Sequence, residues 1–192
     1  MNGPSIAAVA TVVDLVMSAP PTLGAGRLVC VDGPAGSGKT TLASALVRDI
    51  GVRHTSVLHM DDVYEGWTGL DAGMATMSSV VDALRVGGPG RYRRYDWHAG
   101  AYAEEHLVEP VDVLVVEGVG AGGSAYDDAI TCLVWVETPS DVRLRRGLER
   151  DGEGARDHWL AFRAQEEAMF VRERTRDRAD VVVDGQTGMV RK

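Results

Sequence analysis

The fold of this chain is decided by one stretch of its sequence, Gly33-Pro34-Ala35-Gly36-Ser37-Gly38-Lys39-Thr40, which we call the P-loop. The stretch matches the pattern G-x-x-x-x-G-K-[S/T] at every defined position. The apolar run 28–31 comes directly before it, and apolar residues recur at helical spacing over 40–50, so it joins a buried strand to a helix. Glycines let such a loop wrap closely around phosphate groups, and its consecutive N–H groups and the start of the helix attract anions. The stretch therefore predicts a site for nucleotide phosphates.

The P-loop residues divide into a lysine, a hydroxyl and backbone contacts. We expect the compact ammonium of Lys39 to reach the β- and γ-phosphates, which also gives it a part in catalysis. The hydroxyl of Thr40 is expected to bind the accompanying Mg²⁺. ATP and Mg²⁺ are therefore the predicted cofactors. The nucleotide contacts are expected from Gly33, Ala35, Gly36, Ser37, Gly38, Lys39, Thr40 and Thr41.

Apolar runs alternate with helical patterns along the whole chain. Strands are expected over 28–31, 56–60, 111–116, 131–136 and 180–184. Helices are expected over 6–17, 40–50, 71–86 and 157–174, with one more opened by Pro139 and capped by Thr138. This alternation predicts a parallel sheet of five strands with helices on both faces, the three-layer α/β/α fold of P-loop NTPases, as a single domain over 1–192.

Composition limits the partners and the compartment. The net charge of −8 opposes binding to nucleic acid, which is itself a polyanion. Cys30 and Cys132 each lie within an apolar run, which indicates buried thiols in a reducing compartment. No stretch approaches the roughly 20 apolar residues that a membrane-spanning helix needs. We therefore expect a cytoplasmic protein with a small-molecule partner and no membrane or nucleic-acid partner; a homo-oligomer is left open.

Acidic residues follow two of the expected strands. Asp61 and Asp62 come after 56–60, and Glu117 comes after 111–116. The carboxyl ends of parallel strands meet at one edge of a sheet, so these acids are expected near the phosphates. A carboxylate there can accept the proton of an attacking alcohol, while a solvated pair of strand-end acids is the alternative for 61 and 62.

The sequence lacks the motifs of two other classes of P-loop protein. A GTP-binding switch carries Asn-Lys-x-Asp, but the single asparagine of this chain is at position 2. An oligomeric motor ATPase would carry a pair of carboxylates where Glu117 is followed by Gly118.

With these motifs in this order, the chain resembles the uridine kinase and phosphoribulokinase group of P-loop kinases, the uridine-cytidine kinases above all. The resemblance runs from about 27 to 185. Besides the P-loop, it is carried by Asp61-Asp62-Val63-Tyr64, Val116-Glu117-Gly118, Arg143-Leu144-Arg145-Arg146 and Ala179-Asp180-Val181-Val182.

The resemblance implies roles for further residues. Asp61 would be the base that activates the acceptor hydroxyl, and Glu117 and Asp62 would support Mg²⁺. Contacts with the acceptor would come from a substrate-side segment at about 88–106, rich in Gly, Arg and Tyr. The acceptor residues implied are Asp61, Tyr64, Tyr95, Asp96 and Arg143.

Arginines after Pro139 would belong to a short lid at about 143–157 that closes over ATP. Arg143 and Arg156 would contact the nucleotide, and Arg146 and Arg150 would act on the transferring phosphate. Because acidic residues are interleaved with them, a surface helix with salt bridges is the alternative.

The predicted function is therefore transfer of the γ-phosphoryl group of ATP to a hydroxyl of a small metabolite, with a nucleoside such as uridine or cytidine first. A nucleoside monophosphate kinase of the CMP type is one alternative, since Arg91, Arg93 and Arg94 could bind an anionic acceptor. A non-catalytic regulatory protein that binds ATP is the other.

Overall fold

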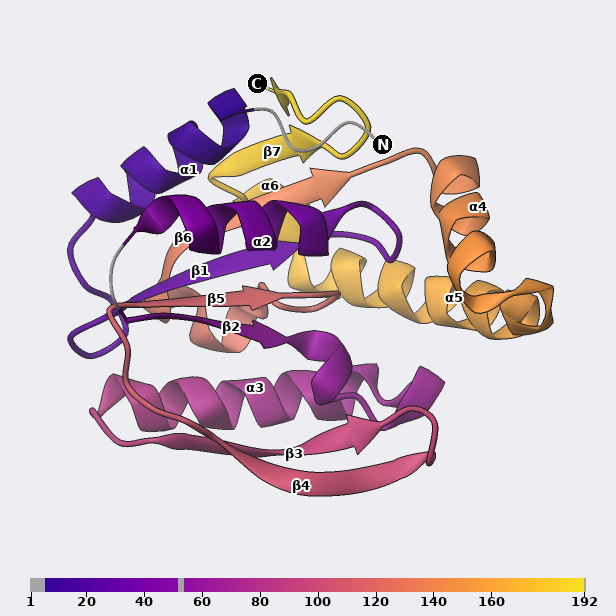
Figure 1. Cartoon of the computed structure of the whole chain (residues 1–192), viewed down its shortest axis with the longest axis horizontal. Coiled ribbons are helices and arrows are strands. Elements are labelled where there is room, and N and C mark those ends of the chain that lie inside the picture. The colour runs from indigo at the N-terminus through magenta and orange to yellow at the C-terminus, as the bar shows by residue number, and fades with distance from the viewer. Residues whose placement is uncertain (1–5, 52–53, 192) are drawn as a thin grey trace.

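A six-stranded sheet forms the centre of the computed structural model, which describes residues 6–51 and 54–191 (Figure 1). Its strand order is β2-β5-β1-β6-β7-β8. Strands β2, β5, β1, β6 and β7 pair in parallel, and β8 pairs antiparallel with β7. The five-stranded parallel sheet is thus confirmed, with a short antiparallel edge strand that was not predicted. The strands are β1 (Arg27–Asp32), β2 (Thr55–His59), β5 (Val113–Glu117), β6 (Ile130–Glu137), β7 (Val181–Asp184) and β8 (Val190–Arg191).

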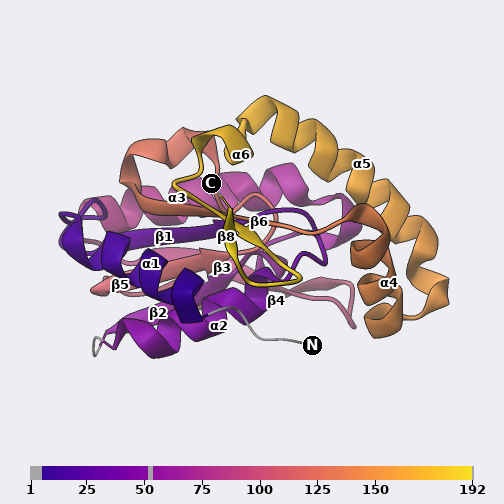
Figure 2. The same ribbon diagram turned by 90° about the horizontal axis from the view of Figure 1, so that it is seen from above.

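Helices cover both faces of the sheet because its central strands are apolar on both faces. Along β1, Leu28 and Cys30 join one core cluster, while Val29 and Val31 join the other. The first cluster is closed by α3 (Leu70–Arg85) and α5 (Arg156–Glu173), and the second by α1 (Ile6–Ser18) and α2 (Lys39–Ile50). Figures 1 and 2 show this layering from two directions.

A separate antiparallel hairpin lies beneath α3 (Figure 1). It pairs β3 (Gly90–Asp96) with β4 (Ala101–Val108), so the substrate-side segment expected at 88–106 contains two strands that were not predicted. Its exposed faces are joined by cross-strand pairs, with Arg91 to Glu105 at 2.8 Å and Arg94 to Glu104 at 2.6 Å.

A helical arm projects from the edge of the sheet where the parallel strands end, at the right of Figure 1. We call it the α4–α5 arm; it runs through α4 (Ser140–Asp151), η4 (Glu153–Ala155) and α5. Its first helix begins after Pro139, without a side-chain cap. The prediction that Thr138 caps this helix is wrong, because the Thr138 hydroxyl donates instead to the carbonyl of Ser37, at 3.0 Å.

The remaining short elements are η1 (Met60–Asp62), η2 (Gly66–Thr68), η3 (Ser124–Ala129) and α6 (Thr175–Arg178). Cys30 and Cys132 are buried and free, as the sequence predicts. Among residues 6–51 and 54–191, no helix combines the length and apolar character that crossing a membrane requires.

The base of the α4–α5 arm depends on one glycine. A Cβ on Gly147 of α4 would lie 2.4 Å from the ring of Trp159 on α5, so the two helices approach more closely than any larger residue allows. We expect Gly147→Ala to lower the free energy of unfolding by about 1–3 kcal/mol through overpacking. Urea unfolding measures this change. Gly154→Ala is the control, because a Cβ there meets nothing within 4 Å, and an equal loss in both variants would contradict the packing argument.

Candidate active site

The P-loop is a backbone cradle that glycines shape. Gly33, Gly36 and Gly38 have φ of 140°, 77° and 108°, in the region that side chains disfavour. A Cβ on Gly33 would also lie 2.1 Å from the carbonyl oxygen of Val136 on the neighbouring strand. The loop leads directly into α2, so its N–H groups and the helix start can act on the same anion.

Lys39 is almost wholly buried at this cradle. Its ammonium donates to the carbonyl oxygens of Gly33 and Pro34, at 2.8 and 3.0 Å, and so bridges the start of the P-loop. No other ammonium is found in the described residues. The positive charge therefore stands where the phosphates of a nucleotide are expected.

Two strand ends and the start of α2 contribute to a chain of hydrogen bonds beside the cradle. Glu117, at the end of β5, is paired in register with both Val31 and His59. One of its carboxylate oxygens accepts from the Thr40 hydroxyl at 3.1 Å and lies 2.6 Å from Nδ1 of His59. The hydrogen bond to Glu117 is the main cause that raises the pKa of His59, although burial lowers it.

Asp61 lies on η1, next to the hydrogen bonds that join Thr40, Glu117 and His59. The pKa of its carboxyl is raised, first because surrounding protein displaces solvent and then because of the negative charge of Glu117. Lys39 and Arg150 act in the opposite direction. The residue as a whole is exposed to solvent, while its carboxyl is electrostatically coupled to the cradle.

An aromatic cluster borders Asp61 on the other side. We define it as Trp67, Trp97, His158, Trp159 and Phe162. Trp67 of η2 is its hub, since its ring stacks on His158 at 5.5 Å and meets the other three rings edge-on at 5.5–6.2 Å. Trp97, which follows β3, donates its ring N–H to the backbone carbonyl of Asp61 at 2.8 Å. The cluster therefore joins the β3–β4 hairpin, the Asp61 turn and the α4–α5 arm.

Comparisons with known proteins show the family of this chain. The family model described as an AAA domain matches residues 29–172, from β1 to the last turn of α5. The chain belongs to this P-loop family.

Proteins named uridine kinases are among the relatives of this P-loop protein. A uridine kinase from Halobacterium salinarum is 28% identical over 176 residues, which is 80% of this chain and 77% of the relative. A uridine kinase from Deinococcus deserti is 31% identical over 144 residues, or 65% of this chain and 68% of the relative. The resemblance to the uridine kinase group is thus confirmed.

Solved structures share the fold. One described as a possible uridine kinase from Bacillus stearothermophilus has a TM-score of 0.63 at 20% identity, covering 92% of this chain and 97% of that one. D-glycerate 3-kinase from Cryptococcus neoformans has a TM-score of 0.54 at 14% identity, covering 94% of each chain.

Two of the four arginines expected to act in this kinase-like protein lie behind the P-loop. Arg143 is buried, and its guanidinium bonds to Glu166 at 2.8 Å and to the carbonyls of Thr138 and Ala35. Arg146 donates to the carbonyl of Gly36 at 3.2 Å. Helical spacing put these side chains on one face correctly, but that face packs on the outside of the loop.

The other two arginines lie farther along the α4–α5 arm. Arg150 is exposed, bonds to Asp151 at 2.7 Å, and lies over the Trp159 ring at 5.7 Å from its centre. Arg156 pairs with Glu153 at 2.8 Å and lines a cavity of about 380 Å³ formed by residues of the arm alone. Of the pair, Arg150 is the one whose charge acts on Asp61.

The residues expected at the acceptor divide between the hairpin and the core. Tyr95 lies on the hairpin and meets Trp97 and Tyr102 edge-on. Asp96 closes the hairpin turn by accepting from the N–H groups of His98 and Ala99, both at 2.9 Å. Tyr64 is in the core instead of at the site: it is 1% exposed, and its hydroxyl donates to the carbonyl of Val119.

The charge of Asp62 acts on both sides of η1. It acts on Tyr92 and Arg94 of the hairpin, and also on His59 and Asp61 beside the cradle. In the described part of the chain, no cluster of three or more His, Cys, Asp or Glu side chains is arranged to hold a metal.

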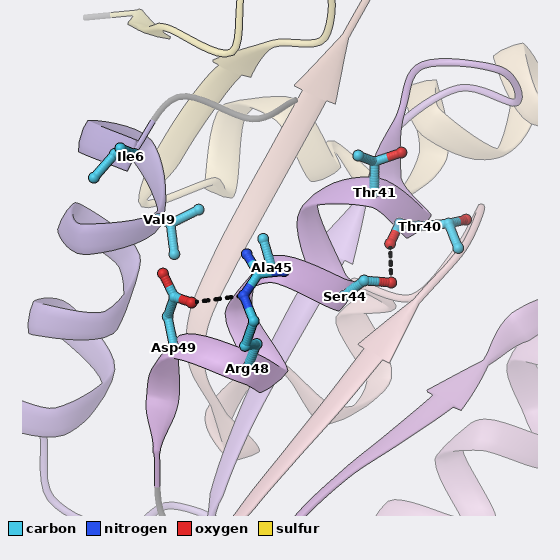
Figure 3. Close-up of a pocket in the computed structure, with 8 residues that line it drawn as sticks. All are labelled: Ile6, Val9, Thr40, Thr41, Ser44, Ala45, Arg48 and Asp49. Carbon is cyan, nitrogen blue, oxygen red and sulfur yellow. Dashed lines mark hydrogen bonds and ion pairs between the residues drawn. The ribbon is translucent and has the colours of Figure 1, made fainter. Parts of the chain in front are cut away.

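A cavity of about 550 Å³ near the P-loop runs along α2 toward α1 (Figure 3). Thr40 and Thr41 line one end, and Arg48 and Asp49 line the other. Lys39, Asp61 and Glu117 do not line it, so the cavity is separate from the side where the acids gather.

Sequence reasoning missed two buried acids that hold the P-loop. Asp32 is fully buried at the end of β1, and its carboxylate accepts from the N–H groups of Gly33, Gly120 and Gly122 at 2.6–2.9 Å. Glu166 of α5 accepts from the N–H of Ala35 at 2.7 Å. An acid directly before the first glycine was a visible clue to Asp32, but Glu166 is distant in sequence.

The buried Asp32 carboxylate predicts a pH dependence of stability. Burial raises its pKa from 3.8 to about 6, against the opposing effect of the N–H groups that bond to it. A pKa that is higher in the folded state stabilises the fold below about pH 4, and this contribution is lost as the pH rises through 6. Relative to Asp32→Asn, the wild-type protein should thus lose about 3 kcal/mol of unfolding free energy across that interval.

Urea unfolding of both proteins between pH 4 and pH 7 measures the difference. Asp14→Asn, at an exposed position on α1, is the control that should track the wild type. A constant difference between wild type and Asp32→Asn over the interval would refute the argument.

Proposed function

We propose that this protein transfers the γ-phosphoryl group of ATP to a hydroxyl of a small metabolite, with a nucleoside such as uridine or cytidine as the first candidate. The position of Asp61 carries the proposal. Its carboxyl is coupled to Lys39 and Glu117 at the phosphate cradle, while its backbone carbonyl is bonded to Trp97 at the hairpin. A base between a donor site and an acceptor surface is the arrangement that hydroxyl phosphorylation needs.

The chemistry assigned to the residues is simple. Asp61 accepts the proton of the acceptor hydroxyl, and the oxygen of that hydroxyl bonds to the γ-phosphorus. The bond from that phosphorus to the β–γ bridging oxygen breaks, and ADP leaves. The raised pKa of Asp61 makes its carboxylate a better proton acceptor. Lys39 and the loop N–H groups stabilise negative charge on the phosphates.

Thr40 and Glu117 suit Mg²⁺ as the metal. They offer hard oxygen ligands from two elements, 3.1 Å apart. Mg²⁺ is commonly held by one or two protein oxygens together with substrate phosphates and water. A metal held there would neutralise charge on the phosphates. The charge of Asp62 also acts on Asp61 and His59, so its carboxylate could support the same site.

Trp97 is the residue we propose for contact with the acceptor. It is 39% exposed, and it is the member of the aromatic cluster bonded to the Asp61 turn. An exposed indole can stack on a nucleobase. Tyr95, which meets Trp97 edge-on, would support its position.

The arginines that a nucleoside monophosphate kinase would need already have partners. Arg91 and Arg94 are paired with Glu105 and Glu104, and Arg93 bonds to the carbonyls of Tyr102 and Ala103. An anionic acceptor would have to displace these contacts, so the hydroxyl acceptor is favoured.

A coupled assay of ADP release tests the proposal. The acceptors are uridine, cytidine, their monophosphates and a panel of sugars, each corrected for hydrolysis without acceptor. We expect ADP release that depends on a nucleoside. Release only with a monophosphate would favour the nucleotide kinase, and nucleotide binding without any acceptor-dependent release would favour the regulatory alternative.

A further inference from the structure

The α4–α5 arm holds the P-loop from its outer side. Three consecutive carbonyl oxygens, of residues 35–37, accept in turn from Arg143, Arg146 and Thr138, at 3.3, 3.2 and 3.0 Å. All three donors belong to α4 or to the two residues that precede it. One short segment of the arm therefore fixes the outward side of the loop.

Peptide geometry connects these contacts to phosphate binding. A peptide unit is planar and trans, so its C=O and the N–H of the next residue point in opposite directions. Holding the carbonyls of residues 35–37 outward therefore orients the N–H groups of residues 36–38. The N–H of Ser37 donates to the carbonyl of Pro34 at 3.1 Å, which leaves those of Gly36 and Gly38 for an anion. These N–H groups are among those that a P-loop offers to phosphate.

A buried ion pair fixes the first of these contacts. Arg143 and Glu166 lie 2.8 Å apart, with side chains 8% and 1% exposed. Glu166 also accepts from the N–H of Ala35, while Arg143 donates to the carbonyl of the same residue. The pair therefore grips both backbone groups of Ala35 and joins α4 to α5 in doing so.

We propose that Arg143 and Glu166 are positioning residues that orient the P-loop for nucleotide phosphates, instead of contacting the phosphates themselves. The inference rests on the proposed function only for the identity of the nucleotide. Stability alone is a poor explanation for such a pair, because desolvation offsets much of the attraction between buried charges. In agreement with this, burial raises the pKa of Glu166, although the N–H of Ala35 and the charge of Arg143 act in the opposite direction.

Glu166→Gln distinguishes an orienting role of Glu166 from the direct effect of its charge on nucleotide binding. Glutamine keeps an acceptor for the Ala35 N–H but gives Arg143 no counter-charge. Removing a negative charge that already acts on Lys39 should by itself strengthen the binding of an anionic nucleotide. Loss of loop orientation should instead weaken it, by about tenfold in Kd for Mg·ADP.

Arg143→Met/Glu166→Leu is the second variant, since apolar replacement of both partners of a buried pair often preserves stability. The control is Glu167→Gln, the exposed neighbour on α5. Calorimetry with Mg·ADP and with Mg·ATP gives Kd for each protein, thermal unfolding without nucleotide reports folding, and steady-state kinetics give KM for ATP and for the acceptor.

We expect Kd and the KM for ATP to rise about tenfold in Glu166→Gln and in the double variant, while the KM for the acceptor and the Glu167→Gln values stay unchanged. Wild-type affinity in a folded double variant, or tighter binding by Glu166→Gln, would overturn the proposal. Because Mg·ADP binding needs no acceptor, these results stand apart from the proposed function. Suppose that the wild-type protein shows no ADP release that depends on an acceptor, while the variants lose nucleotide affinity as expected. Only the proposed function would then be contradicted.

Discussion

Asp61→Asn is expected to lower kcat with a hydroxyl acceptor by about 10²- to 10⁴-fold, the range of general base catalysis. Asparagine has nearly the same shape, so the backbone bond from Trp97 to residue 61 should persist. The amide cannot take up the proton of the acceptor. Nucleotide affinity should stay the same or rise, because a negative charge coupled to Lys39 has been removed.

Single-turnover kinetics and calorimetry with Mg·ATP measure the two effects separately. Asp82→Asn, at an exposed position on α3, is the control and should behave as the wild type. Unchanged turnover in Asp61→Asn would remove the base from the mechanism, whatever the acceptor is.

Lys39→Met is expected to lower kcat by about 10²- to 10³-fold or more and to weaken ATP binding as well. Methionine fills the space of the lysine stem but carries no charge, so the effect is electrostatic. Lys39 is the one ammonium at the cradle within the described residues, and no neighbouring lysine can substitute for it.

The same two measurements apply, and Arg48→Met on the outer part of α2 is the matched loss of one positive charge. If Lys39→Met bound Mg·ATP and turned over as Arg48→Met does, the P-loop would not be the phosphate site.

The central sheet could be predicted because strands buried on both faces appear in the sequence as continuous apolar runs. The strands over 28–31, 56–60, 111–116, 131–136 and 180–184 were found to within two residues, since each is an apolar run that ends at the same edge. The hairpin was missed for the opposite reason: after Gly90, no residue of β3 or β4 is buried, and its strands are held by charged and aromatic pairs.

Side-chain roles were harder to predict than elements. The spacing of Arg143 and Arg146 gives a shared helix face but not what that face packs on. Glu166, more than 20 residues away, decides that Arg143 points to the back of the loop. Tyr64 matched a family motif at an aromatic position, yet it fills the core between Gly73 and Phe162. The roles of Asp61, Thr40 and Glu117 stay predictions that the experiments above address.

The composition of the aromatic cluster has a practical consequence. Three of the four tryptophans in the chain, Trp67, Trp97 and Trp159, meet there, while Trp135 lies against Phe170 elsewhere. Their ultraviolet emission depends on how the rings face one another and on water around them. Any ligand that shifts the hairpin against the arm will change the intrinsic fluorescence of the unlabelled protein, so the molecule carries its own optical reporter.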